Sequence, residues 1–120
     1  MKKILVVEDE MPIRNLYKEE LIDEGYDVIT APDGVEGYKM FKREKPDLIT
    51  IDLKMPNMNG LELLDKIRHE DKSIPIIIYS AYGEFTQNFS TWAADEYLVK
   101  SSDLTEFKNR VKELLSKNIT

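Results

Sequence analysis

The stretch Ile4-Leu-Val-Val-Glu-Asp-Glu10 runs from four apolar residues directly into three acids. Apolar runs without alternation are typical of parallel strands that are buried on both faces. Two similar stretches follow: Leu48–Ile51 ends at Asp52, and Glu96–Val99 ends at Lys100. Open α/β sheets bind their ligands at the carboxyl ends of such strands, so these polar residues stand where a ligand site is expected.

The rest of the chain alternates predicted strands with predicted helices. Pro12 suits the first turn of a helix, Gly25 suits a helix end, and the helix before Pro46 must stop there. Predicted strands cover residues 3–7, 27–31, 47–51, 74–79 and 96–99, and predicted helices cover 12–24, 33 to before 46, 61–70 and 104–116. Such alternation implies right-handed crossovers and a parallel sheet. Five strands suit an α/β, flavodoxin-like, doubly wound sheet of order 2-1-3-4-5.

Each predicted helix carries apolar residues at helical spacing that we expect to pack on the sheet. Asp103 and Glu106 resemble a capping box before the last helix. The side chains expected to face inward are Ile13, Leu16, Tyr17, Leu21, Val35, Tyr38, Phe41, Leu61, Leu64, Ile67, Phe107, Val111 and Leu114.

The segment between the last two predicted strands has mixed signals. Phe85, Phe89 and Trp92 fall at helical spacing, but Gly83 and several Ser, Thr and Asn residues around them are poor helix formers. The sequence therefore predicts a short or mobile fourth helix in this segment.

Length and composition limit the possible classes of protein. A chain of 120 residues is expected to form a single domain, 1–120, with no effector domain. A net charge of −6 argues against a nucleic-acid surface, and the absence of cysteine excludes thiol chemistry. The sequence has no signal-peptide core or membrane span, so we expect a cytoplasmic protein.

In the predicted strand order, the first and third strands are neighbours. Glu8, Asp9 and Asp52 would therefore be crowded into one small volume. Two carboxylates about 4 Å apart repel by roughly 4 kcal/mol at an effective dielectric constant near 20. This arrangement is unfavourable unless a cation or a function compensates for it.

The chain resembles the receiver domains of response regulators (CheY-like) in two-component signalling. The matching motifs are Ile4-Leu-Val-Val-Glu-Asp-Glu10, Asp47-Leu-Ile-Thr-Ile-Asp-Leu-Lys-Met-Pro-Asn-Met-Asn-Gly60, Ile76-Ile-Ile-Tyr-Ser-Ala-Tyr-Gly83 and Ala94-Asp-Glu-Tyr-Leu-Val-Lys100. The resemblance covers the whole chain.

The resemblance implies that Asp52 is the phosphoacceptor, whose carboxylate attacks a phosphohistidine. Lys100 would place its charge on the phosphoryl oxygens, and Ser80 would donate a hydroxyl hydrogen bond to them. A domain of this kind catalyses its own phosphorylation and dephosphorylation and is not a conventional turnover enzyme. The resemblance also implies that movement of Ser80 lets Tyr97 turn inward and switches a protein-interaction surface.

The implied cofactor is Mg²⁺, which prefers hard oxygen ligands. Its ligands would be Glu8, Asp9, Asp52 and the backbone carbonyl of Lys54. The implied partner is a sensor histidine kinase, docking near the first helix and the loop after the fifth strand. A phosphotransfer protein, a second kinase or another target could lie downstream, without nucleic acid or membrane.

Three features depart from the family pattern or refine it. The family usually has Lys-Pro with a cis peptide after the fifth strand, whereas Lys100-Ser101 favours a trans peptide because a cis bond before serine costs about 2.5–4 kcal/mol. The interval from Ser80 to Lys100 is about two residues shorter than the family norm. Lys54 and Tyr82 resemble the pairing in the stand-alone regulator of the sporulation phosphorelay, and predict slow self-dephosphorylation because they hinder the attacking water.

Plainer interpretations remain open for single residues. Asp52 could be a turn or cap residue, Lys100 could pair with Asp95 or Asp103, and Glu10 is more typical of a solvated loop.

Two other protein classes also remain. One is a small flavin electron carrier, in which the acids after the first strand would repel the flavin phosphate. The other is an interaction module that works without phosphorylation.

Overall fold

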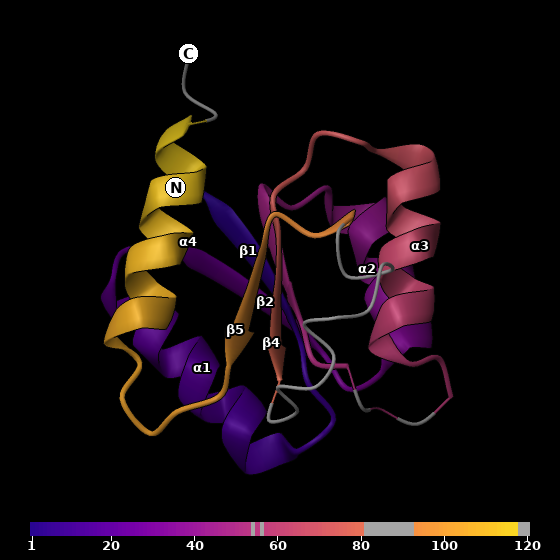
Figure 1. Ribbon diagram of the computed structural model, residues 1–120. Helices are drawn as coiled ribbons and strands as arrows, with labels where there is room; N and C mark the ends of the chain where they lie inside the picture. The colour runs from indigo at the N-terminus through magenta and orange to yellow at the C-terminus, as the bar shows by residue number, and fades with distance from the viewer. Residues whose placement is uncertain (54, 56, 81–92, 118–120) are drawn as a thin grey trace.

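The computed structural model describes residues 1–53, 55, 57–80 and 93–117. The described residues form a five-stranded parallel sheet with the predicted order β2-β1-β3-β4-β5. The strands are β1 (Lys3–Val7), β2 (Asp27–Ala31), β3 (Leu48–Ile51), β4 (Ile76–Ser80) and β5 (Glu96–Val99). β1 and β3 are neighbours in a register that pairs Val7 with Ile51, so their carboxyl ends lie side by side (Figure 1).

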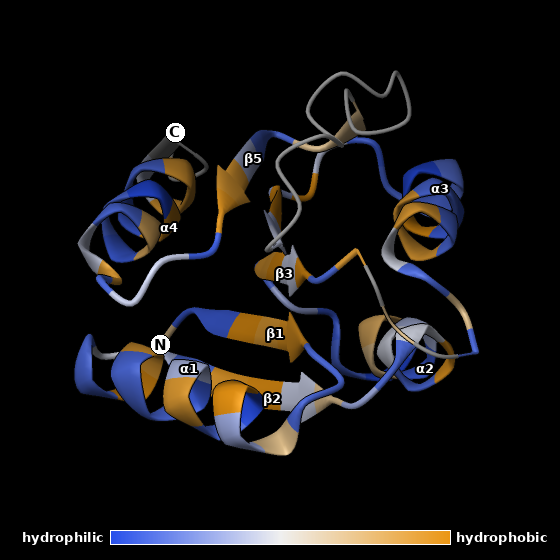
Figure 2. Ribbon diagram, turned by 60° about the horizontal axis from the view of Figure 1, so that its bottom comes forward, coloured by the Kyte–Doolittle hydropathy of each residue, from blue (hydrophilic) through white to orange (hydrophobic). Residues whose placement is uncertain are grey.

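Helices cover both faces of the sheet. The helices are α1 (Met11–Asp23), α2 (Gly34–Glu44), α3 (Gly60–Glu70) and α4 (Thr105–Lys117). In Figure 2, α1 and α4 lie on one side of the sheet and α2 and α3 on the other. α4 corresponds to the helix predicted over residues 104–116, the last one in the sequence. The fourth helix predicted between β4 and β5 falls on residues 81–92, outside the described part of the chain.

Strand alternation divides the core into two layers. On β1, Ile4 and Val6 pack on the side of α1 and α4, while Leu5 and Val7 pack on the side of α2 and α3. All four side chains are almost fully buried, which confirms that β1 is covered on both faces.

The predicted inward faces of α1 and α2 are partly wrong. In α1 the buried residues are Tyr17 and Leu21, and Leu16 is 47% exposed because it lies on the flank of that stripe. In α2 the inward face contains glycines. A Cβ on Gly37 would lie 3.0 Å from Val7 Cγ2, so the helix backbone approaches the sheet closely and Val35 is displaced to the side, 38% exposed.

The third and last helices also differ in detail from the prediction. In α3, Leu63 is fully buried although it was not predicted to be, and Leu61 is only half-buried. At α4, Phe107, Val111 and Leu114 are buried as predicted. The capping box predicted at the start of α4 takes another form, because the Asp103 carboxylate accepts the Thr105 N–H, two residues on (2.9 Å).

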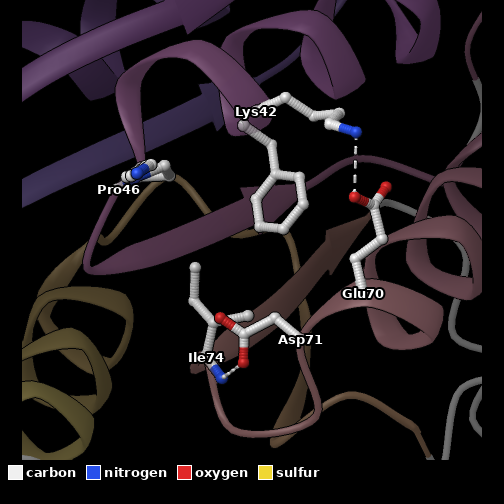
Figure 3. A pocket seen from close by; sticks show the side chains of 7 residues that line it. Lys42, Pro46, Glu70, Asp71 and Ile74 are labelled. Atoms are coloured by element: carbon white, nitrogen blue, oxygen red, sulfur yellow. Dashed lines mark hydrogen bonds and ion pairs between the residues drawn. The ribbon is translucent and has the colours of Figure 1, made fainter.

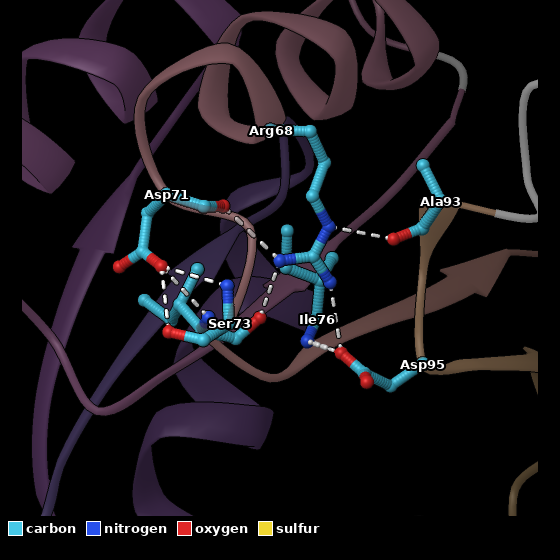
Figure 4. A network of polar contacts seen from close by, with 7 residues as sticks. Arg68, Asp71, Ser73, Ile76, Ala93 and Asp95 are labelled. Atoms are coloured by element: carbon cyan, nitrogen blue, oxygen red, sulfur yellow. Dashed lines mark hydrogen bonds and ion pairs between the residues drawn. The ribbon is translucent and has the colours of Figure 1, made fainter.

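A polar network around Arg68 ties α3 to the start of β5 (Figure 4). The Arg68 guanidinium donates to the carbonyl oxygens of Ile74 and Ala93, each at 2.7 Å, and to Asp95 Oδ2 at 2.9 Å. The same Asp95 oxygen accepts the Ile76 N–H at 2.8 Å. One arginine therefore joins a helix, the loop before β4 and the residues just before β5. No helix among the described residues is both long and apolar enough to cross a membrane.

Candidate functional site

The backbone places two acids at the carboxyl ends of β1 and β3. Glu8 N–H donates to the Ala31 carbonyl at 3.1 Å, and Asp52 N–H donates to the Val7 carbonyl at 3.1 Å. These two bonds extend the parallel hydrogen-bond pattern one residue beyond each strand. The position of each carboxylate is therefore set by the sheet and not by a free loop.

The predicted crowding of acids is confirmed. One carboxylate oxygen each from Glu8, Asp9 and Asp52 lie within 4.8 Å of one another. Glu8 is only 1% exposed and Asp52 only 7% exposed, whereas Asp9 is half-buried. Glu8 Oε2 also accepts the Glu10 N–H at 3.2 Å, and the Glu10 side chain itself is exposed, as expected of a solvated loop residue.

Lys100 reaches this acidic group from the end of β5. Its Nζ lies 2.5 Å from Glu8 Oε1 and 3.4 Å from Asp52 Oδ2. Its backbone N–H donates to the Ser80 carbonyl at 2.7 Å, which aligns the end of β5 with the end of β4. The plainer interpretation, in which Lys100 pairs with Asp95 or Asp103, is not what the structure shows.

Burial controls the charge of this group. It raises the pKa of Glu8 to about 7 from an ordinary value of 4.5, although the Lys100 hydrogen bond acts in the opposite direction. Burial alone would lower the pKa of Lys100. Its hydrogen bond to Glu8 and the negative charge of Asp52 more than reverse this, so the pKa of Lys100 lies above its ordinary value.

The donor set fits a hard divalent cation. Three carboxylates beside one ammonium group leave a net charge of −2 when all are ionised, and every side-chain donor among the three acids is an oxygen. Oxygen donors are the ligands that Mg²⁺ prefers. The acidic cluster is therefore consistent with Mg²⁺ binding. A flavin phosphate would meet the same negative charge, which argues against the electron-carrier alternative.

Ser80 and Tyr97 lie on the neighbouring strands β4 and β5. Ser80 is the last residue of β4, fully buried, and it pairs in register with Val99, next to Lys100. Tyr97 is half-buried and packs on the α2–α3 side of the sheet. By strand alternation Ser80 shares that side of β4 with Ile78, the register partner of Tyr97.

Two predicted residues lie outside the described part of the chain: Lys54, including its backbone carbonyl, and Tyr82. The expected trans peptide is confirmed, because no cis peptide bond occurs among the described residues, which include Lys100 and Ser101.

Sequence reasoning missed the part that Gly60 plays at the site. A Cβ on Gly60 would lie 2.4 Å from the Asp52 carbonyl oxygen and 2.7 Å from Leu53 Cα. The first turn of α3 therefore touches the backbone that carries Asp52, and only a residue without a side chain fits. The signal available in the sequence was Asn59-Gly60 before an apolar helical pattern, where Asn59 and Glu62 form a capping box.

A separate cavity of about 360 Å³ lies away from this site (Figure 3). It is lined by Phe41, Lys42, Lys45, Pro46, Glu70, Asp71 and Ile74. These residues lie at the ends of α2 and α3 and in the loops that enter β3 and β4. The cavity is therefore at the amino ends of the strands, opposite the acidic group, and the Lys42–Glu70 ion pair (3.0 Å) spans it.

Comparison with known proteins places this geometry in a family context. A protein-family model described as "Response regulator receiver domain" matches residues 4–112. The response regulator protein TrrA of Thermotoga maritima, in a crystal structure with Mg(2+)-BeF, is 47% identical with a TM-score of 0.93, over 95% of this chain and 99% of that chain. A second structure, of histidine kinase ThkA in complex with TrrA, matches at 48% identity and a TM-score of 0.90, over 96% of this chain and 99% of that chain.

Two curated relatives come from Bacillus subtilis (strain 168). Sporulation initiation phosphotransferase F is 35% identical over 116 residues, which are 95% of this chain and 94% of that protein. The alkaline phosphatase synthesis transcriptional regulatory protein PhoP is 40% identical over 119 residues, 98% of this chain but 50% of that protein. The chain thus spans about half the length of several curated relatives that it matches.

Proposed function

Because this chain belongs to the response regulator receiver domain family, we propose that Asp52 accepts a phosphoryl group from a histidine kinase in a Mg²⁺-dependent reaction. The observation that carries the proposal is the position of the Asp52 carboxylate. It lies 3.4 Å from Lys100 Nζ and within 4.8 Å of the oxygens of Glu8 and Asp9.

The carboxylates of Glu8, Asp9 and Asp52 would hold the metal ion, and the Lys54 carbonyl is a further proposed ligand. A bound Mg²⁺ would offset the carboxylate repulsion and neutralise charge on the phosphoryl oxygens. Without a cation, an anionic phosphoryl donor approaching these acids would be repelled.

The transfer itself is a substitution at phosphorus. An Asp52 carboxylate oxygen forms the new O–P bond while the N–P bond of the phosphohistidine breaks. The electron pair of that bond stays on the imidazole nitrogen of the donor, which then takes a proton from solvent. Lys100 places its ammonium charge against the phosphoryl oxygens, and the Ser80 hydroxyl donates to one of them.

We propose the switch at the same place. A Ser80 hydroxyl drawn towards the phosphoryl group would leave space beside β4. Tyr97 would turn into that space, since both residues lie on the α2–α3 side of the sheet. This change would alter the outer surface near β5, which is where a downstream protein would detect phosphorylation.

The relatives support the proposed partners. TrrA forms a complex with histidine kinase ThkA, and its structure with Mg(2+)-BeF contains a metal and a fluoride species. Sporulation initiation phosphotransferase F is named for phosphotransfer. By analogy, we propose that a sensor histidine kinase docks near α1 and the loop after β5, and that a phosphotransfer protein can receive the group.

The test of the phosphoacceptor uses acetyl phosphate with and without Mg²⁺. We expect the intact mass of the wild-type protein to rise by one phosphoryl group only when Mg²⁺ is present. Asp52→Ala should not gain this mass, whereas Asp65→Ala, which changes a 78% exposed acid on α3, should behave like the wild type. Equal labelling of Asp52→Ala and the wild type would refute the assignment.

The metal site has its own test. Asp9→Asn removes a ligand and one negative charge, so Mg²⁺ should no longer raise the thermal midpoint. In the absence of metal, the variant should be as stable as the wild type or more stable, because the acids repel one another less. Asp65→Asn is the matched control. A Mg²⁺ response that survives in Asp9→Asn would contradict the proposed ligand set.

We also propose that Lys54 and Tyr82 lengthen the lifetime of the aspartyl phosphate by hindering the attacking water. Replacing both with alanine should shorten the lifetime of the aspartyl phosphate, measured as the decay of the phosphorylated intact mass. An unchanged decay rate would show that these side chains do not shield the site.

A further inference from the structure

Tyr79 precedes Ser80 on β4, and its hydroxyl group contacts the residue that follows Lys100. The Tyr79 hydroxyl donates to the Ser101 carbonyl oxygen and accepts the Ser101 N–H, in both cases at 3.4 Å. Ser101 itself is exposed, and in this structure its N–H is bound by the Tyr79 hydroxyl. A single phenol therefore binds both polar groups of one backbone residue.

The ring of Tyr79 is held firmly in the core. It is 4% exposed, and it stacks on Phe107 of α4 with ring centroids 4.5 Å apart and planes only 7° from parallel. Tyr17 of α1 packs against it at 5.3 Å. Two helices thus fix the position of this hydroxyl, so it can serve as a rigid support for the loop after β5.

Together these contacts hold the backbone on both sides of Lys100. The N–H of Lys100 donates to the Ser80 carbonyl at 2.7 Å, and the next residue is bound by Tyr79. Both supports come from consecutive residues of β4. A lysine side chain is long and flexible, so the direction in which its backbone presents it decides how often its ammonium group reaches the site.

From this arrangement we propose that Tyr79 is a positioning residue for phosphoryl transfer. It holds the Lys100–Ser101 backbone so that Lys100 Nζ stays beside Glu8 and Asp52. The proposal rests on the proposed function of Asp52 and adds to it a residue that touches neither metal ion nor phosphoryl group.

The test is Tyr79→Phe, which keeps the stacked ring and removes only the hydroxyl. We expect its rate of phosphorylation by acetyl phosphate to fall only about 2- to 10-fold, because the two hydrogen bonds that are lost to Ser101 are long, at 3.4 Å each. Mg²⁺ affinity should stay within about twofold of the wild type, because Tyr79 is not a ligand. Tyr38→Phe is the matched control: it also removes a tyrosine hydroxyl bond, to Glu70, on the α2–α3 surface.

A double-mutant cycle with Lys100→Met separates positioning from general stability. If Tyr79 acts through Lys100, Tyr79→Phe should change the rate little once the ammonium group is gone. An equal slowing in both backgrounds, or no slowing in either, would overturn the proposal.

Hydrogen exchange gives a measurement that does not depend on the reaction. The Ser101 amide should exchange several-fold faster in Tyr79→Phe than in the wild type and in Tyr38→Phe. Unchanged exchange at Ser101 would overturn the proposal even if phosphorylation were slowed. A wild-type protein that gains no phosphoryl mass would instead refute the proposed function, and with it any role of Tyr79 in transfer.

Discussion

Two opposing influences act on the ionisation of the buried Glu8 side chain. It is 1% exposed and bonded to Lys100, yet its pKa is raised to about 7 because burial penalises the ionised form. A cation beside it favours ionisation. The charge of this residue therefore depends on what occupies the site.

The raised pKa of Glu8 predicts a pH-dependent stability. Its folded value of about 7 lies above the ordinary 4.5, so the contribution to stability is complete below about pH 4.5 and is lost as the pH rises through 7. In the presence of a metal chelator, the free energy of unfolding of the wild type should fall from pH 5 to pH 8. Relative to Glu8→Gln, this fall should be at most about 3 kcal/mol.

Urea unfolding at several pH values measures this difference. Asp71 and Asp103 have lowered pKa values, so their contributions to the pH dependence of stability lie below the range from pH 5 to pH 8. Parallel stability curves for the wild type and Glu8→Gln would show that Glu8 ionises as easily in the folded protein as in the unfolded chain.

At the scale of single elements, a helix approaches the backbone of the loop after β3 closely at the site. α3 begins at Gly60, directly against the backbone of Asp52. Asn59 and Glu62 cap this helix end and hold the contact in place. The position of the backbone at Asp52, the proposed phosphoacceptor, therefore depends on how α3 starts.

Gly60→Ala should disturb both stability and function. Its new Cβ would lie 2.4 Å from a backbone oxygen that cannot move independently, so we expect a loss of about 1–3 kcal/mol. Phosphorylation by acetyl phosphate should also slow at least tenfold. Gly25→Ala is the control: it also strains the chain, at φ +97°, but has no neighbour within 4 Å. Equal phosphorylation rates in the two variants would show that the α3 contact does not position Asp52.

Arg68 has a comparable part in joining elements at the other end of the sheet. Arg68→Met leaves three carbonyl groups and the Asp95 carboxylate without their guanidinium partner, so we expect a loss of about 2–3 kcal/mol. Arg43→Met, at a side chain that is 68% exposed, should cost less than about 0.5 kcal/mol. Chemical denaturation of both variants measures the difference. Similar losses in the free energy of unfolding would mean that the network around Arg68 adds little to stability.

At the scale of the whole molecule, the sheet separates two apolar layers that share every strand. Leu21 lies in the layer with α1 and α4, and Leu64 lies in the layer with α2 and α3. Both are fully buried. Because each strand contributes to both layers, neither layer can come apart without exposing the other.

Leu21→Ala and Leu64→Ala should therefore each cost about 2–5 kcal/mol and still unfold in one transition. Leu16→Ala, at 47% exposure, should cost well under half as much. Far-UV and near-UV circular dichroism during urea unfolding report on backbone and packing separately. Transitions that separate in either buried variant would show that the layers unfold independently.

Much of this protein could be predicted from local patterns. The strands, their order and the three acids at the strand ends follow from unbroken apolar runs and from the connection rules of parallel sheets. Such patterns record which positions are buried along one element. They do not record how close a helix comes to the sheet, which is why Val35 and Leu16 were wrongly assigned to the core.

Contacts between elements were decided by the tertiary structure. Lys100 had three candidate acidic environments in the sequence, and only the folded sheet brings its ammonium group to Glu8 and Asp52. The contact of Tyr79 with Ser101 and that of Gly60 with Asp52 join residues more than five positions apart. Periodicity along one strand or helix carries no information on such distances, because they depend on how separate elements pack.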